Sequence, residues 1–203
     1  DISAYLMDSG DTERKARMQL DRFARLEQFI LGSLREGSLQ TSCKLLNDKA
    51  VTQGIATSKE KDVRTLLYFL SVKGYTRKTE DAGHNIMVDR TADAETTLRR
   101  FEKRLYICRF AIEWLYRQAE RRSAATEKTD SITFSVIELM RQMGQGQQEL
   151  FGQIGTIQIE DVEEALLYLS KIGAIKLEGG FLVLYNAMEI RRIKDSKLRY
   201  KID

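Results

Sequence analysis

The sequence predicts an α+β protein, mainly helical with small β-hairpins, in which one arrangement of elements occurs twice. Two observations predict this class. Aligning Gly74 with Gly173 gives an offset of 99 residues (173 − 74 = 99), and residues upstream of both glycines then match. After each glycine the hydrophobic pattern changes from helical spacing to short runs typical of strands. The identical pairs are Asp62 and Asp161, Val63 and Val162, Leu67 and Leu166, Leu70 and Leu169, and Ser71 and Ser170.

An amphipathic helix precedes each of the two aligned glycines. Apolar residues follow the i, i+3, i+4, i+7 rule in both, which predicts one buried stripe on each helix. Gly74 and Gly173 suit the left-handed position that ends a helix. The stripes consist of Val63, Leu66, Leu67 and Leu70 in the first copy, and of Val162, Ala165, Leu166 and Leu169 in the second.

A hairpin is predicted after each glycine. Residues 174–177 and 181–185 are rich in aliphatic and aromatic side chains around Gly179 and Gly180, a two-glycine turn signal. In the first copy, residues 75–78 and 85–88 predict a longer hairpin around the polar residues 80–84.

The upstream elements also correspond. Leu20, Phe23, Leu26, Ile30 and Leu34 predict a helix that ends at Gly37, and residues 38–41 predict a strand before a helix that carries Leu45 and Leu46. In the second half, residues 96–122 predict a long helix and residues 131–134 a strand. Ser135 with Glu138 forms a capping box for the next helix, and Thr57 with Glu60 has the same spacing.

The order helix, strand, helix, helix, hairpin is that of a winged helix, so the chain is predicted to hold two winged-helix domains in tandem, joined by a long helix. The alternative is that two unrelated leucine-rich helices match by chance. The predicted segments are 1–19 (the end of a preceding domain, or a linker), 20–93 (first winged helix), 94–190 (second, with the long helix) and 191–203 (the start of a following segment). Because the chain begins without methionine and ends within a charged run, we expect a fragment of a longer protein.

Composition narrows the classes of function. The 203 residues carry a net charge of +3, which permits nucleic acid as a partner. No apolar run is long enough to span a membrane and no signal peptide opens the chain, so a cytoplasmic protein is expected. Cys43 and Cys108 lie far apart without CxxC spacing, which argues against disulfide frameworks and zinc modules.

Motifs of catalysis are missing from the sequence. It has no GxxxxGK[ST] phosphate loop, and its single histidine, His84, has no sequence partner that would make it a base or a metal ligand. The carboxylates at 160–164 fall in the first turns of a helix, where the helix dipole favours negative charge. We therefore expect no cofactor in this chain and leave open whether the whole protein is an enzyme.

Basic residues are the strongest functional signal. We expect them to contact DNA phosphates, which fixes position without reading sequence. The alternative is a solvated face with i, i+4 ion pairs such as Glu95 with Arg99. The candidates are Lys59, Lys61, Arg64, Lys73, Arg77 and Lys78 in the first copy, and Arg99, Arg100, Lys103 and Arg104 in the long helix.

The second copy has a different charge. The helix before Gly173 is acidic, and its carboxylates would repel phosphates: Glu160, Asp161, Glu163 and Glu164. We expect DNA contact there only through the hairpin, with Lys176 on a phosphate and Phe181 as an apolar wedge. The alternatives are that Phe181 packs inward, and that the acidic helix 160–171 docks a basic protein partner.

Both ends of the chain resemble parts of a known family. "DISAYLMDSGDTERKARMQLDRF" (residues 1–23) resembles the strand and helix that close the second motor domain of RecQ-family DNA helicases, and "YNAMEIRRIKDSKLRYKID" (residues 185–203) resembles the run after the winged-helix region of large bacterial RecQ-like helicases. The resemblance implies a parent ATP-dependent helicase of DNA repair and recombination, with ATP and Mg²⁺ bound by motor domains outside this chain. It also implies strand separation by an aromatic wing tip, for which His84 and Phe181 are the local equivalents. The family's four-cysteine zinc module has no counterpart here.

The first hypothesis is therefore a DNA-binding accessory region of a RecQ-like helicase, which grips duplex or fork DNA next to the motor domains. The second is a protein-docking scaffold of tandem winged-helix type. The third is a stand-alone DNA-binding initiator or regulator.

Overall fold

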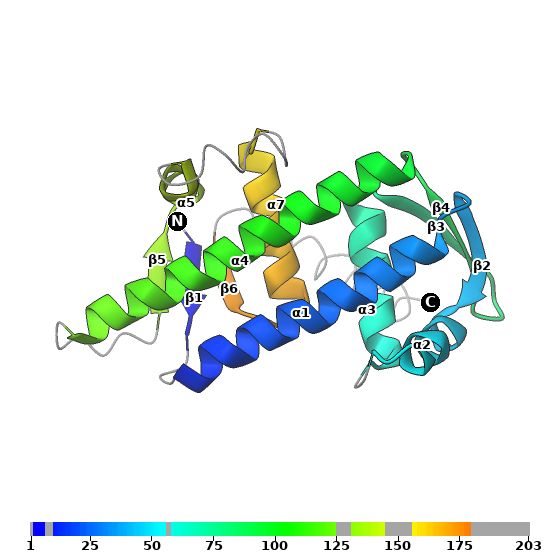
Figure 1. Ribbon diagram of the computed structural model, residues 1–203, viewed down its shortest axis with the longest axis horizontal. Coiled ribbons are helices and arrows are strands. Elements are labelled where there is room, and N and C mark those ends of the chain that lie inside the picture. Colours follow the sequence, from blue (N-terminus) through cyan, green and yellow to red (C-terminus); the bar gives the residue numbers. More distant parts are fainter. Residues whose placement is uncertain (1, 7–9, 56–57, 125–130, 145–155, 180–203) are drawn as a thin grey trace, which may run out of the picture.

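The protein is a mainly helical α+β structure with two small antiparallel sheets (Figure 1). The computed structural model describes residues 2–6, 10–55, 58–124, 131–144 and 156–179. None of the helices in these ranges is long and apolar enough to cross a membrane.

The first half contains three helices and one sheet. Its elements are α1 (Gly10–Ser33), β2 (Ser38–Ser42), α2 (Cys43–Thr52), α3 (Glu60–Val72), β3 (Thr76–Glu80) and β4 (Asn85–Arg90). The strands are ordered β2-β4-β3, and both pairs are antiparallel. The hairpin expected after Gly74 is therefore present, with Ile86 and Val88 buried beneath it.

The second half follows the same order but borrows a strand. Its elements are α4 (Ala94–Ala124), β5 (Ser131–Phe134), α5 (Val136–Gly144), α7 (Ile159–Lys171) and β6 (Lys176–Gly179). The central strand of its sheet is β1 (Ile2–Tyr5), which gives the order β5-β1-β6. Thus β1 occupies the place that β4 has in the first sheet. The predicted strand 181–185 and the segment 191–203 lie outside the described residues.

The start of the chain differs from the prediction. Residues 1–19 were assigned to a preceding domain or linker, but Ile2 and Ala4 are 2% and 0% exposed in the second sheet. The helix predicted from Leu20 begins at Gly10, and its Ala16 is buried. Four alternating residues are too short a pattern to reveal a sheet partner about 130 positions away.

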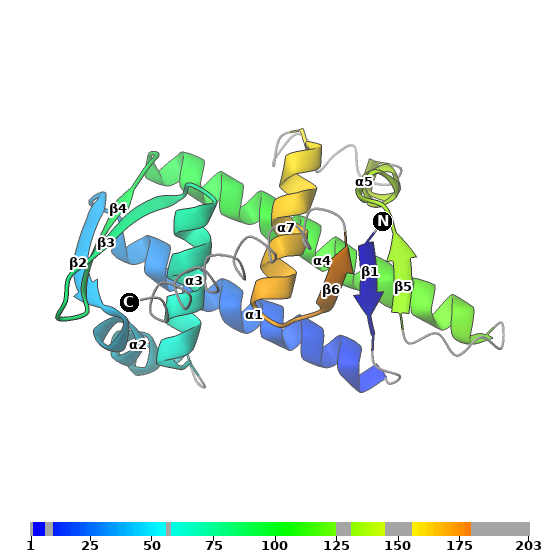
Figure 2. The same ribbon diagram turned by 180° about the vertical axis from the view of Figure 1, so that it is seen from behind.

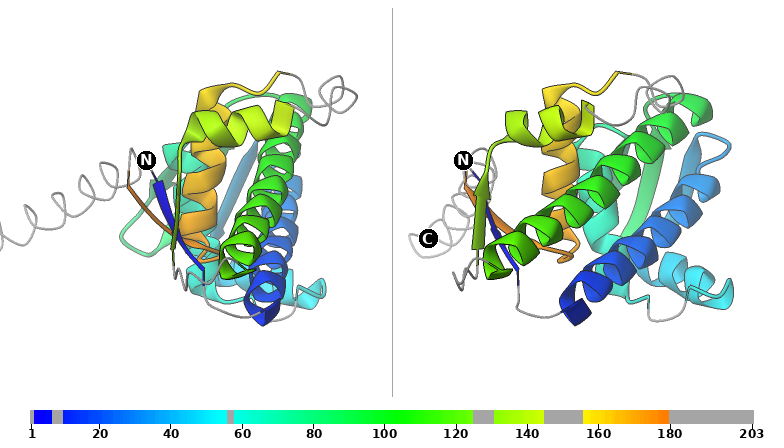
Figure 3. Two further views of the ribbon diagram at one scale, coloured as in Figure 1. Left: turned by 90° about the vertical axis from the view of Figure 1, so that its left-hand side faces the viewer. Right: turned by 60° about the vertical axis from the view of Figure 1, so that its left-hand side comes forward.

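The two halves form one body. Helices α1 and α4 run antiparallel along its length, with the two sheets at opposite ends (Figure 1). Seen from behind, α3 and α7 lie side by side across them (Figure 2). The sheet of β5, β1 and β6 packs against both long elements of its half: β6 contacts α7, and β5 contacts α4 through Phe134 and Trp114, whose ring centroids are 5.7 Å apart (Figure 3).

An approximate two-fold relation links the halves. Helices α3 and α7 have the same length and begin 99 positions apart (159 − 60 = 99). Phe69 and Tyr168 are equivalent at this offset and contact one another, with ring centroids 5.1 Å apart. Gly74 and Gly173 adopt φ values of 74° and 72°, as the left-handed helix end requires.

Helix capping confirms one expectation and corrects another. Ser135 accepts a hydrogen bond from the Glu138 amide at 3.1 Å, as predicted. Helix α3 is capped by Asp62, which accepts from the Lys59 amide at 3.0 Å, and Asp161 repeats this on α7 at 2.8 Å from the Gln158 amide. The box expected from Thr57 and Glu60 was therefore placed two residues too early.

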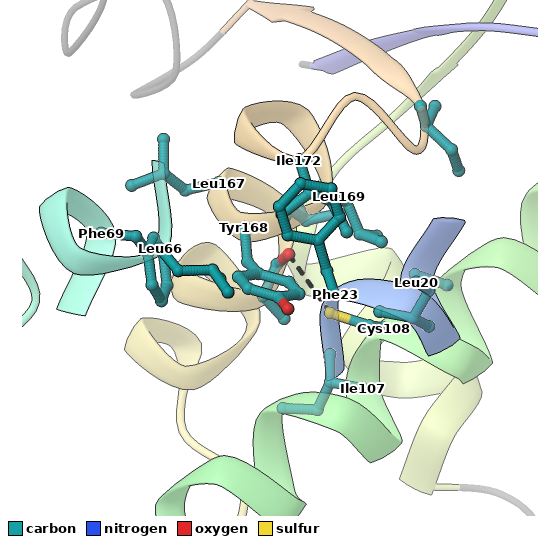
Figure 4. Close-up of a cluster of buried hydrophobic side chains, with 14 of the residues drawn as sticks. Leu20, Phe23, Leu66, Phe69, Ile107, Cys108, Leu167, Tyr168, Leu169 and Ile172 are labelled. Atoms are coloured by element: carbon teal, nitrogen blue, oxygen red, sulfur yellow. Dashed lines mark hydrogen bonds between the residues drawn. The ribbon is translucent and has the colours of Figure 1, made fainter. Parts of the chain in front are cut away.

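The hydrophobic core is continuous through both halves. Phe23 of α1, Leu66 and Phe69 of α3, Cys108 of α4 and Tyr168 of α7 belong to one cluster (Figure 4). The sequence predicted two domains, and the structure shares one core between them.

Candidate functional site

Arg104 of α4, a predicted phosphate contact, lies in the core. Its exposed fraction is 2%, and it donates two hydrogen bonds to the fully buried carboxylate of Glu27 on α1. Tyr75 donates to Glu164 at 2.7 Å and lies 3.4 Å from Arg104 Nε, which extends the network to α7. The prediction that Arg104 contacts DNA is wrong, because the side chain is enclosed.

The charges of this network are stabilised by one another. Burial opposes the charge on Arg104, but the adjacent Glu27 carboxylate raises the pKa of the guanidinium well above its usual value. Burial raises the pKa of the Tyr75 hydroxyl, which therefore stays protonated and donates to Glu164. Four aromatic rings enclose the guanidinium, with centroids 4.4–5.7 Å from Cζ: Phe69, Tyr75, Phe101 and Tyr168.

The neighbouring basic residues of α4 pair with the acidic helix α7. Arg100 forms an ion pair with Glu164 and also donates to the Lys73 carbonyl at 2.6 Å. Lys103 Nζ lies 3.4 Å from Asp161. Two cations of the basic stripe thus pair with two carboxylates of the acidic helix, although the sequence suggested two separate binding surfaces.

Arg99, one turn before Lys103 on α4, faces solvent. Its side chain is 66% exposed and pairs with Glu95 at 2.5 Å. This is the solvated i, i+4 pair that the sequence analysis left as the alternative.

Basic residues are exposed on the outer side of α3. Lys59, Lys61 and Arg64 face solvent there, and Arg64 pairs with Glu60 at 3.0 Å. Tyr68 is 37% exposed one turn further on, and Lys171 of α7 lies 5.9 Å from its ring. We call this surface the α3 face, consisting of Lys59, Glu60, Lys61, Arg64, Tyr68 and Lys171.

The hairpin of β3 and β4 is less basic than expected. Arg77 is exposed but lies opposite Asp89 in the strand register. Lys78 is opposite the buried Val88, and its side chain is 21% exposed and 3.9 Å from Glu80. Both cations therefore have a carboxylate close by.

The tip of this hairpin is acidic. His84 is 85% exposed, has a φ of 62°, and lies 3.5 Å from Glu80. Hydrogen bonds from the Asn85 side chain and amide lower the pKa of Asp81, so this carboxyl is charged at neutral pH. Two carboxylates at the tip disfavour phosphate contact by His84.

The predicted residues of the second hairpin are described only in part. Lys176 is 71% exposed, pairs with Glu178 at 3.6 Å, and lies 5.1 Å from the Tyr5 ring. Phe181 lies outside the described residues.

Lys73, a predicted phosphate contact at the end of α3, is half-buried. Its backbone carbonyl accepts the hydrogen bond from Arg100.

Sequence reasoning missed two exposed tyrosines, Tyr5 and Tyr68. Tyr68 follows Arg64 by four positions on the polar side of a helix, which is a signal that an aromatic residue there faces solvent. Tyr5 has no such signal, because the strands that pair with β1 lie about 130 and 170 positions away in the sequence.

Comparison with known proteins identifies no relative: no family model, no curated protein and no solved structure matches this chain. Within the part of the chain that the structure describes, no group of three or more histidine, cysteine or acidic residues is arranged to hold a metal ion.

Proposed function

We propose that the chain is a DNA-binding module of tandem winged-helix type, in which the α3 face of the first winged helix contacts duplex or fork DNA. The observation that carries this proposal is the charge of that exposed face, four cations and one carboxylate. A helix that presents a basic outer side beyond a buried stripe fits the major groove, with lysine and arginine on phosphates.

The strand orders support the winged-helix assignment. In both sheets the strand that precedes the helix pair lies next to the central strand, and the strand after the third helix lies on its other side. The second winged helix is completed by β1 in this interpretation.

The second copy is unsuited to the same contact. At the offset of 99, Glu160 and Glu163 take the places of Lys61 and Arg64, and Leu167, in the place of Tyr68, is 1% exposed. Helix α7 therefore serves as a support for α4, and the first copy binds the DNA.

A protein-docking role for helix α7 has less support. Of its four carboxylates, Asp161 and Glu164 already pair with Lys103 and Arg100, which leaves Glu160 and Glu163 for a basic partner. The proposed context is an accessory region of a RecQ-like ATP-dependent helicase, and the sequence resemblance at the two chain ends is its support.

The test is a salt titration of the whole chain against fluorescent duplex and forked DNA. Lys61→Ala combined with Arg64→Ala should weaken binding roughly a hundredfold, since each of the two charged hydrogen bonds contributes about 1.5 kcal/mol. It should also reduce the salt slope by about 2, because each phosphate contact contributes about 0.9.

Arg99→Ala is the matched control, because Arg99 is as exposed as Arg64 and also has a glutamate one turn before it. Equal weakening by Arg99→Ala, or no DNA binding at low salt, would refute the proposal. Preference for a fork would support the helicase context. Preference for one duplex sequence would favour the initiator or regulator.

A further inference from the structure

A cleft of about 400 Å³ lies where α1, the end of α4 and the strands β1 and β6 meet. Tyr5 and Lys176 line it from the sheet, Lys15 from α1 and Tyr116 from α4. In Figure 2 the first turns of α1 lie below β1 and β6, at the end of the molecule away from β2. The cleft uses none of the residues of the α3 face.

We propose that this cleft binds a nucleotide of single-stranded DNA, with the base against a tyrosine ring and the phosphates at the lysines. Sites for single strands combine aromatic rings, on which bases stack, with cations along the backbone. The cleft has two of each. Its volume falls within the range of about 300–1,000 Å³ typical of small-ligand sites.

Tyr5 is held in place by contacts within the sheet. Its side chain is on the outer face of β1, because Ile2 and Ala4 are buried on the inner face, and it is 39% exposed. Its hydroxyl donates to Glu178 at 3.2 Å, and Lys176 pairs with the same carboxylate at 3.6 Å. Glu178 thus holds the Tyr5 ring together with the Lys176 ammonium group, which lies over the ring at 5.1 Å from its centroid.

Lys15 supplies a second cation to the cleft. It faces solvent from α1, and no carboxylate of the described residues forms an ion pair with it. One turn further along α1, Gln19 donates to the Ile172 carbonyl at 2.9 Å, which fastens the helix to the segment that enters β6.

The open rim favours a polymer over a free nucleotide. Lys176 is 71% exposed, so a backbone can enter and leave past it. The cleft also neighbours the α3 face: Lys171 belongs to that face, and Gly173 two residues later lines the cleft. In this arrangement a single strand leaves a duplex held at the α3 face and enters the cleft. This part of the inference rests on the proposed function.

The test compares variants of the cleft residues Tyr5 and Lys15 with a control on α1 outside the cleft. Anisotropy is measured with a fluorescent oligo-dT and with a fluorescent hairpin duplex. Tyr5→Leu and Lys15→Ala should each weaken oligo-dT binding roughly tenfold and leave duplex binding unchanged. Tyr5→Phe should keep oligo-dT affinity, since the stacking ring is retained. Arg17→Ala, which removes a 52% exposed cation two residues from Lys15, should leave oligo-dT binding unchanged.

Unchanged oligo-dT affinity in both Tyr5→Leu and Lys15→Ala would overturn the assignment, as would competition by dTMP at concentrations comparable with the oligonucleotide. Circular dichroism of each variant shows whether it folds, and Lys15→Ala alters only an exposed helix position. If the duplex does not bind but oligo-dT binds in a Tyr5-dependent way, the proposed function is rejected and the assignment of the cleft as a single-strand site is retained.

Discussion

The buried ion pair of Glu27 and Arg104 provides the sharpest test of how the two halves are joined. The two side chains are 0% and 2% exposed and come from α1 and α4. In Glu27→Leu, the guanidinium keeps its aromatic neighbours and, among the polar groups of the described residues, the Tyr75 hydroxyl at 3.4 Å and Glu164 at 3.9 Å. Breaking a buried pair from one side costs about 3–5 kcal/mol, because the remaining charge stays enclosed.

Replacing both partners should restore much of this loss. Glu27→Leu with Arg104→Met leaves no unpaired charge from the pair and adds apolar groups among four aromatic rings, and such replacements are often neutral or stabilising. We expect each single variant to lose about 6–20 °C in Tm, at about 2–4 °C per kcal/mol for a chain of this size. The double variant should lie closer to the wild type than either.

The assay is a double-mutant cycle from urea unfolding, followed by the fluorescence of Trp114, the only tryptophan. The exposed pair Glu95 and Arg99 on α4 is the control, and its cycle should show no measurable coupling. Losses that simply add in the double variant would refute the reasoning, since they would show that the pair does not act as a unit.

Three further results are expected. Both cysteines are buried, and burial raises the pKa of the Cys108 thiol. Neither Cys43 nor Cys108 should therefore react with a thiol reagent at pH 8 until the chain unfolds. Fast labelling of either would contradict the core described here. Asp93 caps α4 by accepting a hydrogen bond from the Thr96 amide, which lowers the pKa of the Asp93 carboxyl. The contribution of Asp93 to stability is therefore present above its unfolded pKa of about 3.9 and is lost as pH falls further. Asp93→Asn keeps an acceptor and should lose less stability than the wild type between pH 5 and 2, as measured by thermal melts. Ala4→Glu places a charge in the centre of the second sheet and should shift Trp114 emission to the red; an unchanged spectrum would mean that β1 does not complete this sheet.

The helices and the first sheet could be predicted because their signals are local. The offset of 99 gave the relation of α3 and α7, and Gly74 and Gly173 marked both helix ends. Spacing along a helix determines which side chains share a face, and Leu66 and Leu70 are buried as that rule requires.

The candidate site was predicted less well, because its determinants lie far apart in sequence. Nothing near Arg104 indicates that Glu27, 77 positions earlier, lies opposite to it. The same holds for Lys103 and Asp161. A run of cations along a long helix shows how many charges are present, while the partner helix decides which of them remain exposed. Lys61 and Arg64 remain exposed because none of the described helices and strands covers that side of α3.

The place of β1 affects the order in which the protein folds. The first half spans residues 10–90, and its contacts can form as soon as that stretch has been synthesised. The second sheet is different: Ile2 pairs with Phe134 and Gly179, so β1 waits until both of these later segments have been synthesised. Closing so long a loop is slow, and the cost is entropic. During that interval Ile2 and Ala4 lie at the end of a folded first half as a short, unpaired apolar strand that another chain can capture.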